Sequence, residues 1–173
     1  MIDYAFEGWQ DRLVPIEQIE PHPDNPNEGD VEAIVESVIV NGCYRPVWVS
    51  RRSNRIVGGT HLYLAHLQVG ASHVPVDWVT CRDDEHELRI LIVDNELTRK
   101  GIYIEPILIE SLQRLKDTPV GLAGTGFDRG ALERLVENEK RPLDLTTLIR
   151  DPEALHHRTR CPECKHVFVP KPI

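Results

Sequence analysis

The alternation of apolar and polar residues predicts a mixture of strands and helices in the first half of the chain. Segments rich in β-branched and aromatic residues indicate strands over residues 13–19, 45–51, 55–59 and 73–81. The turn "RSN" between the middle two predicts a hairpin-like pair. Apolar residues at helical spacing predict helices over 31–42, with Asp30 as the N-cap, and over 60–70.

The last third of the chain has helical periodicity. Asp84 and Glu87 have the spacing of a capping box, so we expect a helix from Asp84 to about Thr98. Two further amphipathic helices are predicted over 104–116 and 127–140. A mixed first half followed by helices indicates an α+β fold, with a small mixed sheet and packed helices, rather than a doubly wound sheet.

Periodicity fades after Lys140, so we expect a domain over 1–140 followed by a linker and a short cysteine-containing tail over 141–173. A chain of 173 residues with 40% hydrophobic and 28% charged residues can bury a real core. We find no apolar window of membrane-spanning length and no secretory signal, and therefore expect a cytoplasmic protein without membrane partners. In that compartment the cysteines are expected as thiols or metal ligands, with Cys43 and Cys81 as buried free thiols.

The net charge of −8 argues against broad, sequence-independent binding of DNA by the whole surface. The charge is uneven, because residues 141–173 contain six Lys/Arg and four Asp/Glu. Contact with nucleic acid is therefore expected to be local, through "SRRSNR" at 50–55 or through the tail. The alternative is that the arginines at 50–55 are solvated turn residues.

The stretch "RIVGGTHLYLAHLQVG" over 55–70 predicts a strand that turns on two glycines into the start of a helix. Unpaired backbone N–H groups at such a start attract anions, and Gly58 and Gly59 allow a ligand to approach the backbone closely. Thr60 can cap the helix or offer a hydroxyl, and His61 can offer a ring N–H. The alternative is a turn that only changes the direction of the chain.

A wider set of motifs resembles the ParB/sulfiredoxin superfamily. These motifs are "LVPIEQIEPHPDNPN", the segment from "DVEAIVESVIVNG" through "RPVWV" and "GGTHLYLA" to "HVPVDWV", then "LIVDNELT" and "GTGFDRGALERL". The resemblance covers residues 12–137 and is strongest to the ParB-like N-terminal ("ParB-like nuclease") domains of bacteria and their phages. It implies the ParB/sulfiredoxin-like form of an α+β fold.

The resemblance also implies a set of binding residues. Residues 58–61 would form the phosphate-binding box, and Asp94 and Asn95 would face a triphosphate and its Mg²⁺, with CTP or ATP as the nucleotide. Arg99, about one helical turn past Asn95, could reach a phosphate. The alternative for Asp94, Asn95 and Arg99 is an exposed helix face with a local ion pair.

Related enzymes that phosphorylate small hydroxylated substrates use a helix glutamate as a base, and this makes Glu36 a candidate catalytic residue beside His61. The alternative for Glu36 is a solvated acidic face shared with Glu32. An active enzyme would be a Mg²⁺-dependent nucleotide hydrolase, a nuclease or a kinase.

The sequence also departs from these relatives. Sulfiredoxins carry a cysteine where this chain has Thr60, which excludes sulfinic-acid reduction through a cysteine at that position. Chromosome-partitioning ParB proteins carry an arginine-rich box after the glycine, whereas "THLYLA" has no arginine. No DNA-reading helix-turn-helix segment or dimerising tail is evident after the core.

The tail "RCPECKHVF" over 160–168 has the pattern of a zinc knuckle. Cys161 and Cys164 can hold one zinc ion, with His166 and His157 as candidates to complete a four-ligand site. A second protomer could supply ligands instead, which keeps a homodimer open. An unmetallated or degenerate ribbon is the remaining alternative.

Three classes of function fit these observations. The first is a ParB-like protein of DNA transactions that binds a nucleotide or a nucleic-acid phosphate at Gly58–His61. The second is a phosphotransfer enzyme of the same fold, either a nuclease or a kinase of a small molecule or DNA base. The third is an adaptor that recruits a partner through its zinc tail while the core is inert.

Overall fold

The computed structural model describes residues 8–140, 159–160 and 167–168. The chain divides into two compact units, Met1–Val136 and Glu137–Ile173. Within the second unit, β6 (Thr159–Arg160) pairs antiparallel with β7 (Val167–Phe168). The four predicted zinc ligands lie outside the described residues: Cys161, Cys164, His166 and His157. Across the described residues, no helix combines the length and apolar character needed to cross a membrane.

The first unit contains a mixed five-stranded sheet with the order β1-β5-β3-β4-β2. Its strands are β1 (Leu13–Pro15), β2 (Glu20–Pro21), β3 (Val47–Ser50), β4 (Arg55–Gly58) and β5 (His73–Val79). β3 pairs antiparallel with β4, as the predicted hairpin requires, and parallel with β5. The sheet and its helices confirm the predicted α+β fold.

The helices are α1 (Val31–Asn41), α2 (Thr60–Gln68), α3 (Asp84–Lys100), α4 (Glu105–Lys116) and α5 (Arg129–Lys140). Asp30 caps α1, as predicted, by accepting the N–H of Ala33 at 2.9 Å. The predicted capping box is wrong, because Glu87 bonds to Ser50 and Ser53 rather than to the helix start. Helix α3 begins at Asp84, as predicted, but its cap is Asp83 rather than Asp84, and Asp83 accepts the N–H of His86. Both are aspartates, so the sequence does not distinguish them as caps.

The predicted strand over 13–19 is shorter in the structure, where only Leu13–Pro15 is extended as β1 at one edge of the sheet. β1 ends at Pro15, and a 3-10 turn over Ile16–Gln18 redirects the chain into β2, which pairs in parallel with β4. A turn of this kind with its flanking residues spans about 13 Å, whereas five flat strands would be about 19 Å wide. The sheet must therefore curve so that its edges approach one another.

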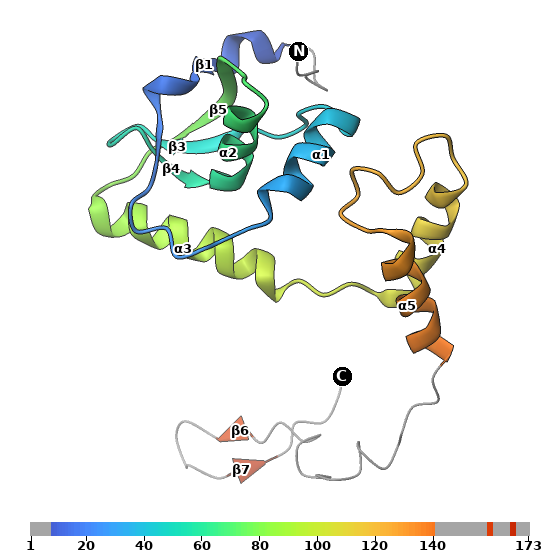
Figure 1. Cartoon of the computed structure of the whole chain (residues 1–173). Coiled ribbons are helices and arrows are strands. Elements are labelled where there is room, and N and C mark those ends of the chain that lie inside the picture. Colours follow the sequence, from blue (N-terminus) through green and yellow to red (C-terminus); the bar gives the residue numbers. More distant parts are fainter. Residues whose placement is uncertain (1–7, 141–158, 161–166, 169–173) are drawn as a thin grey trace. The chain divides into compact units, whose positions relative to one another are not determined.

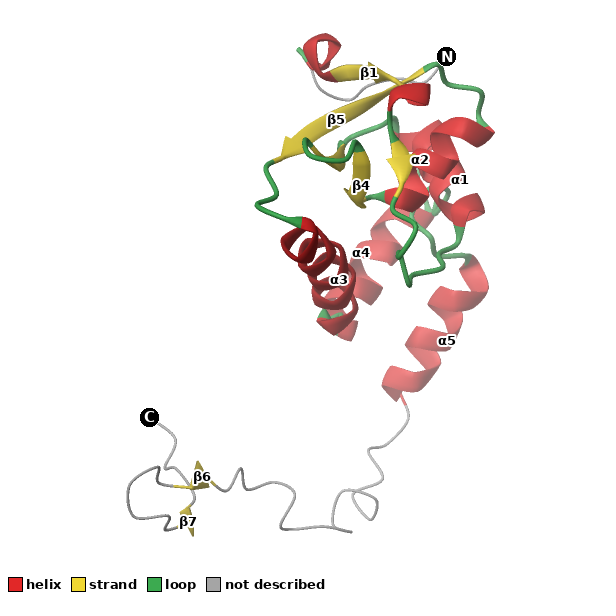
Figure 2. Ribbon diagram, turned by 90° about the vertical axis from the view of Figure 1, so that its left-hand side faces the viewer, coloured by secondary structure: helices red, strands yellow, loops and turns green. Residues whose placement is uncertain are grey.

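Successive side chains of β3 point to opposite faces of the sheet, and helices pack on both faces. Val47 and Val49 are buried in the main core cluster together with residues of α1 and α2, among them Leu62. Trp48 and Ser50 point to the opposite face, where Ser50 contacts α3. Helices α1 and α2 therefore lie side by side on one face and α3 lies on the other (Figure 1, Figure 2).

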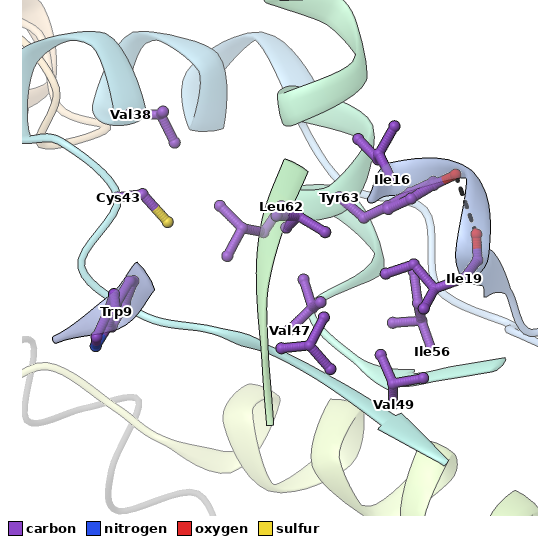
Figure 3. Packing of buried hydrophobic residues seen from close by; sticks show 12 residues of the cluster. Trp9, Ile16, Ile19, Val38, Cys43, Val47, Val49, Ile56, Leu62 and Tyr63 are labelled. Carbon is purple, nitrogen blue, oxygen red and sulfur yellow. Dashed lines mark hydrogen bonds between the residues drawn. The ribbon is translucent and has the colours of Figure 1, made fainter. Parts of the chain in front are cut away.

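The core cluster includes residues of the 3-10 turn that follows β1 and of the position just after it. Ile16 and Ile19 are buried beside Leu62 and Tyr63 of α2, and the Tyr63 hydroxyl donates to the backbone oxygen of Ile19 at 3.4 Å (Figure 3). Cys43 is also buried here as a free thiol. This packing holds residues 16–19 against helix α2.

A buried carboxylate attaches α3 to the sheet. Glu87, 2% exposed, accepts hydrogen bonds from the hydroxyls of Ser50 (2.5 Å) and Ser53 (2.7 Å), which lie at the β3–β4 turn. The buried His22 places its Nε2 3.5 Å from the same carboxylate, while its Nδ1 accepts the N–H of Asp24. The loop after β2, the β3–β4 turn and α3 therefore meet at Glu87.

We predict that Glu87→Leu destabilises the protein by about 2–4 kcal/mol, because the hydroxyls of Ser50 and Ser53 lose their acceptor in a buried position. Chemical denaturation measures the free energy of unfolding. Glu85→Leu is the control, since Glu85 is exposed on the same helix, and it should change the free energy by less than about 0.5 kcal/mol. Equal effects of the two substitutions would contradict the anchoring role of Glu87.

His66 of α2 is fully buried and predicts a pH-dependent stability. Its Nδ1 lies 2.8 Å from the backbone oxygen of Leu62, its Nε2 has no partner, and burial lowers its pKa from 6.5. The unfolded chain then binds the proton more readily than the folded one. The stabilisation is complete above about pH 6.5 and is lost as the pH falls toward the lowered pKa of the folded state.

Denaturation curves measured between pH 7.5 and pH 5, at about half-unit steps, should show this loss for the wild type and a shallower slope for His66→Gln. The variant lowers stability at every pH because it replaces a buried ring, so the slope and not the absolute value is the readout. Parallel curves for the two proteins would show that another group causes the loss.

Candidate functional site

A cavity of about 180 Å³ opens where α2 begins and α3 passes over β4. The sequence-predicted binding residues all line it: Gly58, Gly59, Thr60, His61, Asp94, Asn95 and Arg99. The fold therefore brings together two segments of the chain that are more than thirty residues apart in sequence.

The N-terminus of α2 faces this cavity without a side-chain cap. Gly59, with φ +81°, is the N-cap, and the first helical hydrogen bond runs from the N–H of Tyr63 to the oxygen of Gly59 at 3.1 Å. The N–H groups of Thr60, His61 and Leu62 precede that bond and are the unpaired donors of the helix start. Thr60 is thus the first helical residue rather than the cap.

A bulge in β4 shapes the floor of the site. The ladder pairs Trp48 with Gly58 but Val49 with Ile56, so Val57 is an extra residue. A Cβ on Gly58 would lie 2.8 Å from Cε3 of Trp48 and 3.1 Å from Oδ2 of Asp94. The absence of that Cβ allows the Asp94 carboxylate to lie directly against the strand.

Asp94 is the negative group of the cavity. It is half-buried, and desolvation raises its pKa, while the positive charge of Arg45 acts in the opposite direction. Asn95 beside it donates its Nδ2 to the oxygen of Leu91 (2.9 Å) and to Oδ1 of Asn25 (3.4 Å). These donations leave the Oδ1 of Asn95 as its acceptor for a ligand.

His61 is held by the loop that precedes α1. Its Nε2 accepts the N–H of Gly29 at 2.8 Å, so Nδ1 carries the ring proton in the neutral form. A Cβ on Gly29 would come within 3.0 Å of the ring. His61 therefore fixes this loop over the cavity and has only Nδ1 left to donate to a ligand.

Arg99 lies on the exposed rim of the cavity, at the end of α3. Its Nε is 3.4 Å from Glu96, an ion pair of the kind that the alternative interpretation anticipated. A solvated pair of this type contributes little, so Arg99 can exchange Glu96 for another anion at small cost.

Glu36 lies apart from these residues. Its Oε1 accepts the N–H of Gly124 at 3.2 Å, and Asn41 donates to the oxygen of the same glycine at 3.0 Å. Glu36 lines a different hollow, with residues of α5 and the loop before it, and does not line the cavity of Asp94. Its role as a catalytic base stays a prediction.

A second cavity of about 240 Å³ adjoins the first. It lies between α1, the segment Gly42–Arg45 and the loop Gly124–Gly126, and it shares Ile34, Arg45 and Leu62 with the first cavity. Cys43 lines it with a thiol whose pKa is raised by burial. The two cavities together offer a polar end and a more apolar end.

Sequence reasoning missed several residues of the first cavity: Asn25, Asn27, Arg45 and Thr98. The asparagines come from the loop "PDNPN", whose composition predicts only a turn. Arg45 precedes the proline of "RPVWV" and is distant in sequence from the glycine turn. Only a three-dimensional arrangement of the strands brings these residues together.

The arginines of the β3–β4 turn are engaged within the protein. Arg52 pairs with Asp84 at 2.8 Å and Arg55 with Glu20 at 3.3 Å. The guanidinium of Arg51 lies 5.6 Å from the ring centre of Trp78. Contact between this turn and nucleic acid stays a prediction, and it would have to compete with these interactions.

Comparison with known proteins finds no matching family model and no matching curated protein. Among solved structures, the C-terminally truncated chromosome-partitioning protein ParB from Caulobacter crescentus, complexed with CTP-gamma-S, matches with a TM-score of 0.60 at 22% identity, over 79% of this chain and 82% of that one. A structure of the same truncated protein complexed to the centromeric parS site matches with a TM-score of 0.42 at 22% identity, over 80% and 76% of the two chains. The match with a TM-score of 0.60 confirms the predicted ParB-like fold.

Proposed function

We propose that this protein binds a nucleoside triphosphate with Mg²⁺ in the two adjoining cavities and acts in DNA transactions as a ParB-like protein. The observation that carries the proposal is that an uncapped helix N-terminus and a half-buried carboxylate line one cavity. The first attracts anions and the second attracts cations. A Mg²⁺–phosphate group satisfies both.

The phosphates would bind at the start of α2. Backbone N–H groups of Thr60, His61 and Leu62 are available there, and Gly58 and Gly59 let phosphate oxygens approach the backbone. The solved ParB structure with the similar fold is complexed with CTP-gamma-S, which supports a nucleotide as the ligand.

The donor set beside the phosphates fits Mg²⁺. Asp94 offers a carboxylate and Asn95 an amide oxygen, and Mg²⁺ is commonly bound by one or two protein oxygens together with phosphate oxygens and water. The described residues contain no cluster of three or more metal-ligating His, Cys, Asp or Glu. The ion would therefore enter with the phosphates, and Asp94 and Asn95 would orient it.

The nucleoside would lie in the second cavity. That cavity has the larger volume of the two and is bordered by the apolar side chains of Ile34 and Val38 of α1 and by the segment Gly42–Arg45. The shared residues Ile34, Arg45 and Leu62 border both cavities, so the two cavities adjoin. A ligand with an apolar planar end and an anionic end matches this arrangement.

Calorimetry with CTP, ATP and GTP, each with and without Mg²⁺, tests the proposal. We expect wild-type protein to bind at least one of them more tightly with Mg²⁺, and Asp94→Asn to weaken the Mg²⁺-dependent binding by about tenfold or more. Glu85→Gln is the control, because it removes one carboxylate from the exposed side of the same helix. Absence of nucleotide binding by the wild type under both conditions would overturn the proposal.

We predict that the bound nucleotide strengthens attachment to DNA. Mobility-shift assays with a fluorescent random-sequence duplex should show tighter binding by the wild type when the Mg²⁺ nucleotide is present, and a steep decrease with salt. Asp94→Asn should retain the basal shift and lose the increase. Identical shifts with and without nucleotide would contradict a nucleotide-dependent role on DNA.

A further inference from the structure

Arg45 occupies the junction of the two cavities. It is one of three residues that line both, and the other two, Ile34 and Leu62, are apolar. Pro46 follows it and restricts its backbone to an extended conformation at the entry to β3. A ligand that fills both cavities must pass beside this side chain.

Within the part of the chain that the structure describes, the guanidinium of Arg45 forms no ion pair. Other arginines of the sheet and its helices form ion pairs: Arg12, Arg52, Arg55, Arg89 and Arg99. Among the residues that the structure describes, no carboxylate lies within 4.0 Å of Arg45. Asp94 lines only the first cavity and Cys43 lines only the second, whereas Arg45 lines both.

The phosphate end of the site needs a positive side chain. The turn from Gly58 to Ala65 contains no lysine or arginine, and Asp94 adds a negative charge to the same cavity. Helix N–H groups alone carry about half an elementary charge. Of the residues that line the first cavity, Arg45 and Arg99 are the two cations, and Arg99 is already paired with Glu96 on the rim.

We propose that Arg45 binds the phosphate next to the nucleoside and thereby makes the site specific for nucleoside 5′-phosphates. The inference rests on the proposed function. The nucleoside lies on one side of the junction and the outer phosphates on the other, so the first phosphate lies at Arg45. Its planar fork donates two parallel hydrogen bonds to phosphate oxygens.

This arrangement separates the contributions of Arg45 and Asp94. Arg45 contacts the first phosphate and is needed for mono-, di- and triphosphates alike. Asp94 acts through Mg²⁺ and matters for the ligands whose outer phosphates reach the start of α2. Inorganic triphosphate has no nucleoside to occupy the second cavity, so Arg45 should contribute little to its affinity.

The test measures affinities of the full chain for the mono-, di- and triphosphate of the nucleoside that binds best, and for inorganic triphosphate. Arg45→Gln should weaken binding of all three nucleotides by about 10- to 100-fold, since a charge-assisted hydrogen bond is lost. Arg45→Lys should recover part of the affinity, because the charge remains without the fork. Arg82→Gln is the matched control: it removes the same charge from an exposed position outside both cavities and should stay within about twofold.

Thermal unfolding checks that the variants are folded, and Arg45→Lys serves as the folded variant if Arg45→Gln is not.

The outcomes distinguish the two proposals. Nucleotide binding by the wild type that is equally tight in Arg45→Gln would overturn the role of Arg45 and leave the proposed function in place. A loss confined to the triphosphate would also overturn it, because the contact would then be with an outer phosphate. If the wild type binds no nucleotide, both proposals are wrong.

Discussion

The site depends on one buried interaction, the attachment of the Glu87 carboxylate to the hydroxyls of Ser50 and Ser53. A buried carboxylate without donors would be strongly unfavourable, so this contact fixes both the position and the rotation of α3. Asp94 follows Glu87 by about two helical turns, or about 10 Å along the axis. Fixing Glu87 at the β3–β4 turn therefore places Asp94 at the other end of β4, against Gly58.

The same contact organises the loop that covers the cavity. His22 lies beside Glu87, and the loop after it reaches His61 through the N–H of Gly29. Asn25 of this loop accepts from Asn95 of α3. The cavity is thus enclosed by elements that each connect to Glu87 or to its neighbours. The connection at His61 uses its ring and leaves its backbone N–H, which is proposed to bind phosphate, unpaired.

Much of this architecture was predictable from the sequence and some of it was not. The strand–glycine–helix pattern at 55–70 predicted the start of α2, because glycines and apolar spacing are local signals. The family resemblance implied that residues 58–61 and Asp94 belong to one site, whereas the close approach of Asp94 to Gly58 is seen only in the structure. The sequence did not predict that Arg45 lines the cavity or that Glu87 bonds to Ser50 and Ser53. Both contacts depend on the order and curvature of the strands. A short 3-10 turn that carries the chain from one sheet edge to the other leaves no periodic signal.

The charges of the cavity explain why an anion and a cation should enter together. The start of α2 attracts an anion, yet Asp94 repels it, and Asp94 attracts a cation that finds too few protein ligands to hold it. Binding either ion alone leaves one of these groups unsatisfied, whereas a Mg²⁺–phosphate pair neutralises both. Arg45 alters this balance because it offsets part of the Asp94 charge before any ion is present. It therefore favours entry of the phosphate, and the metal requirement should become stricter when Arg45 is removed.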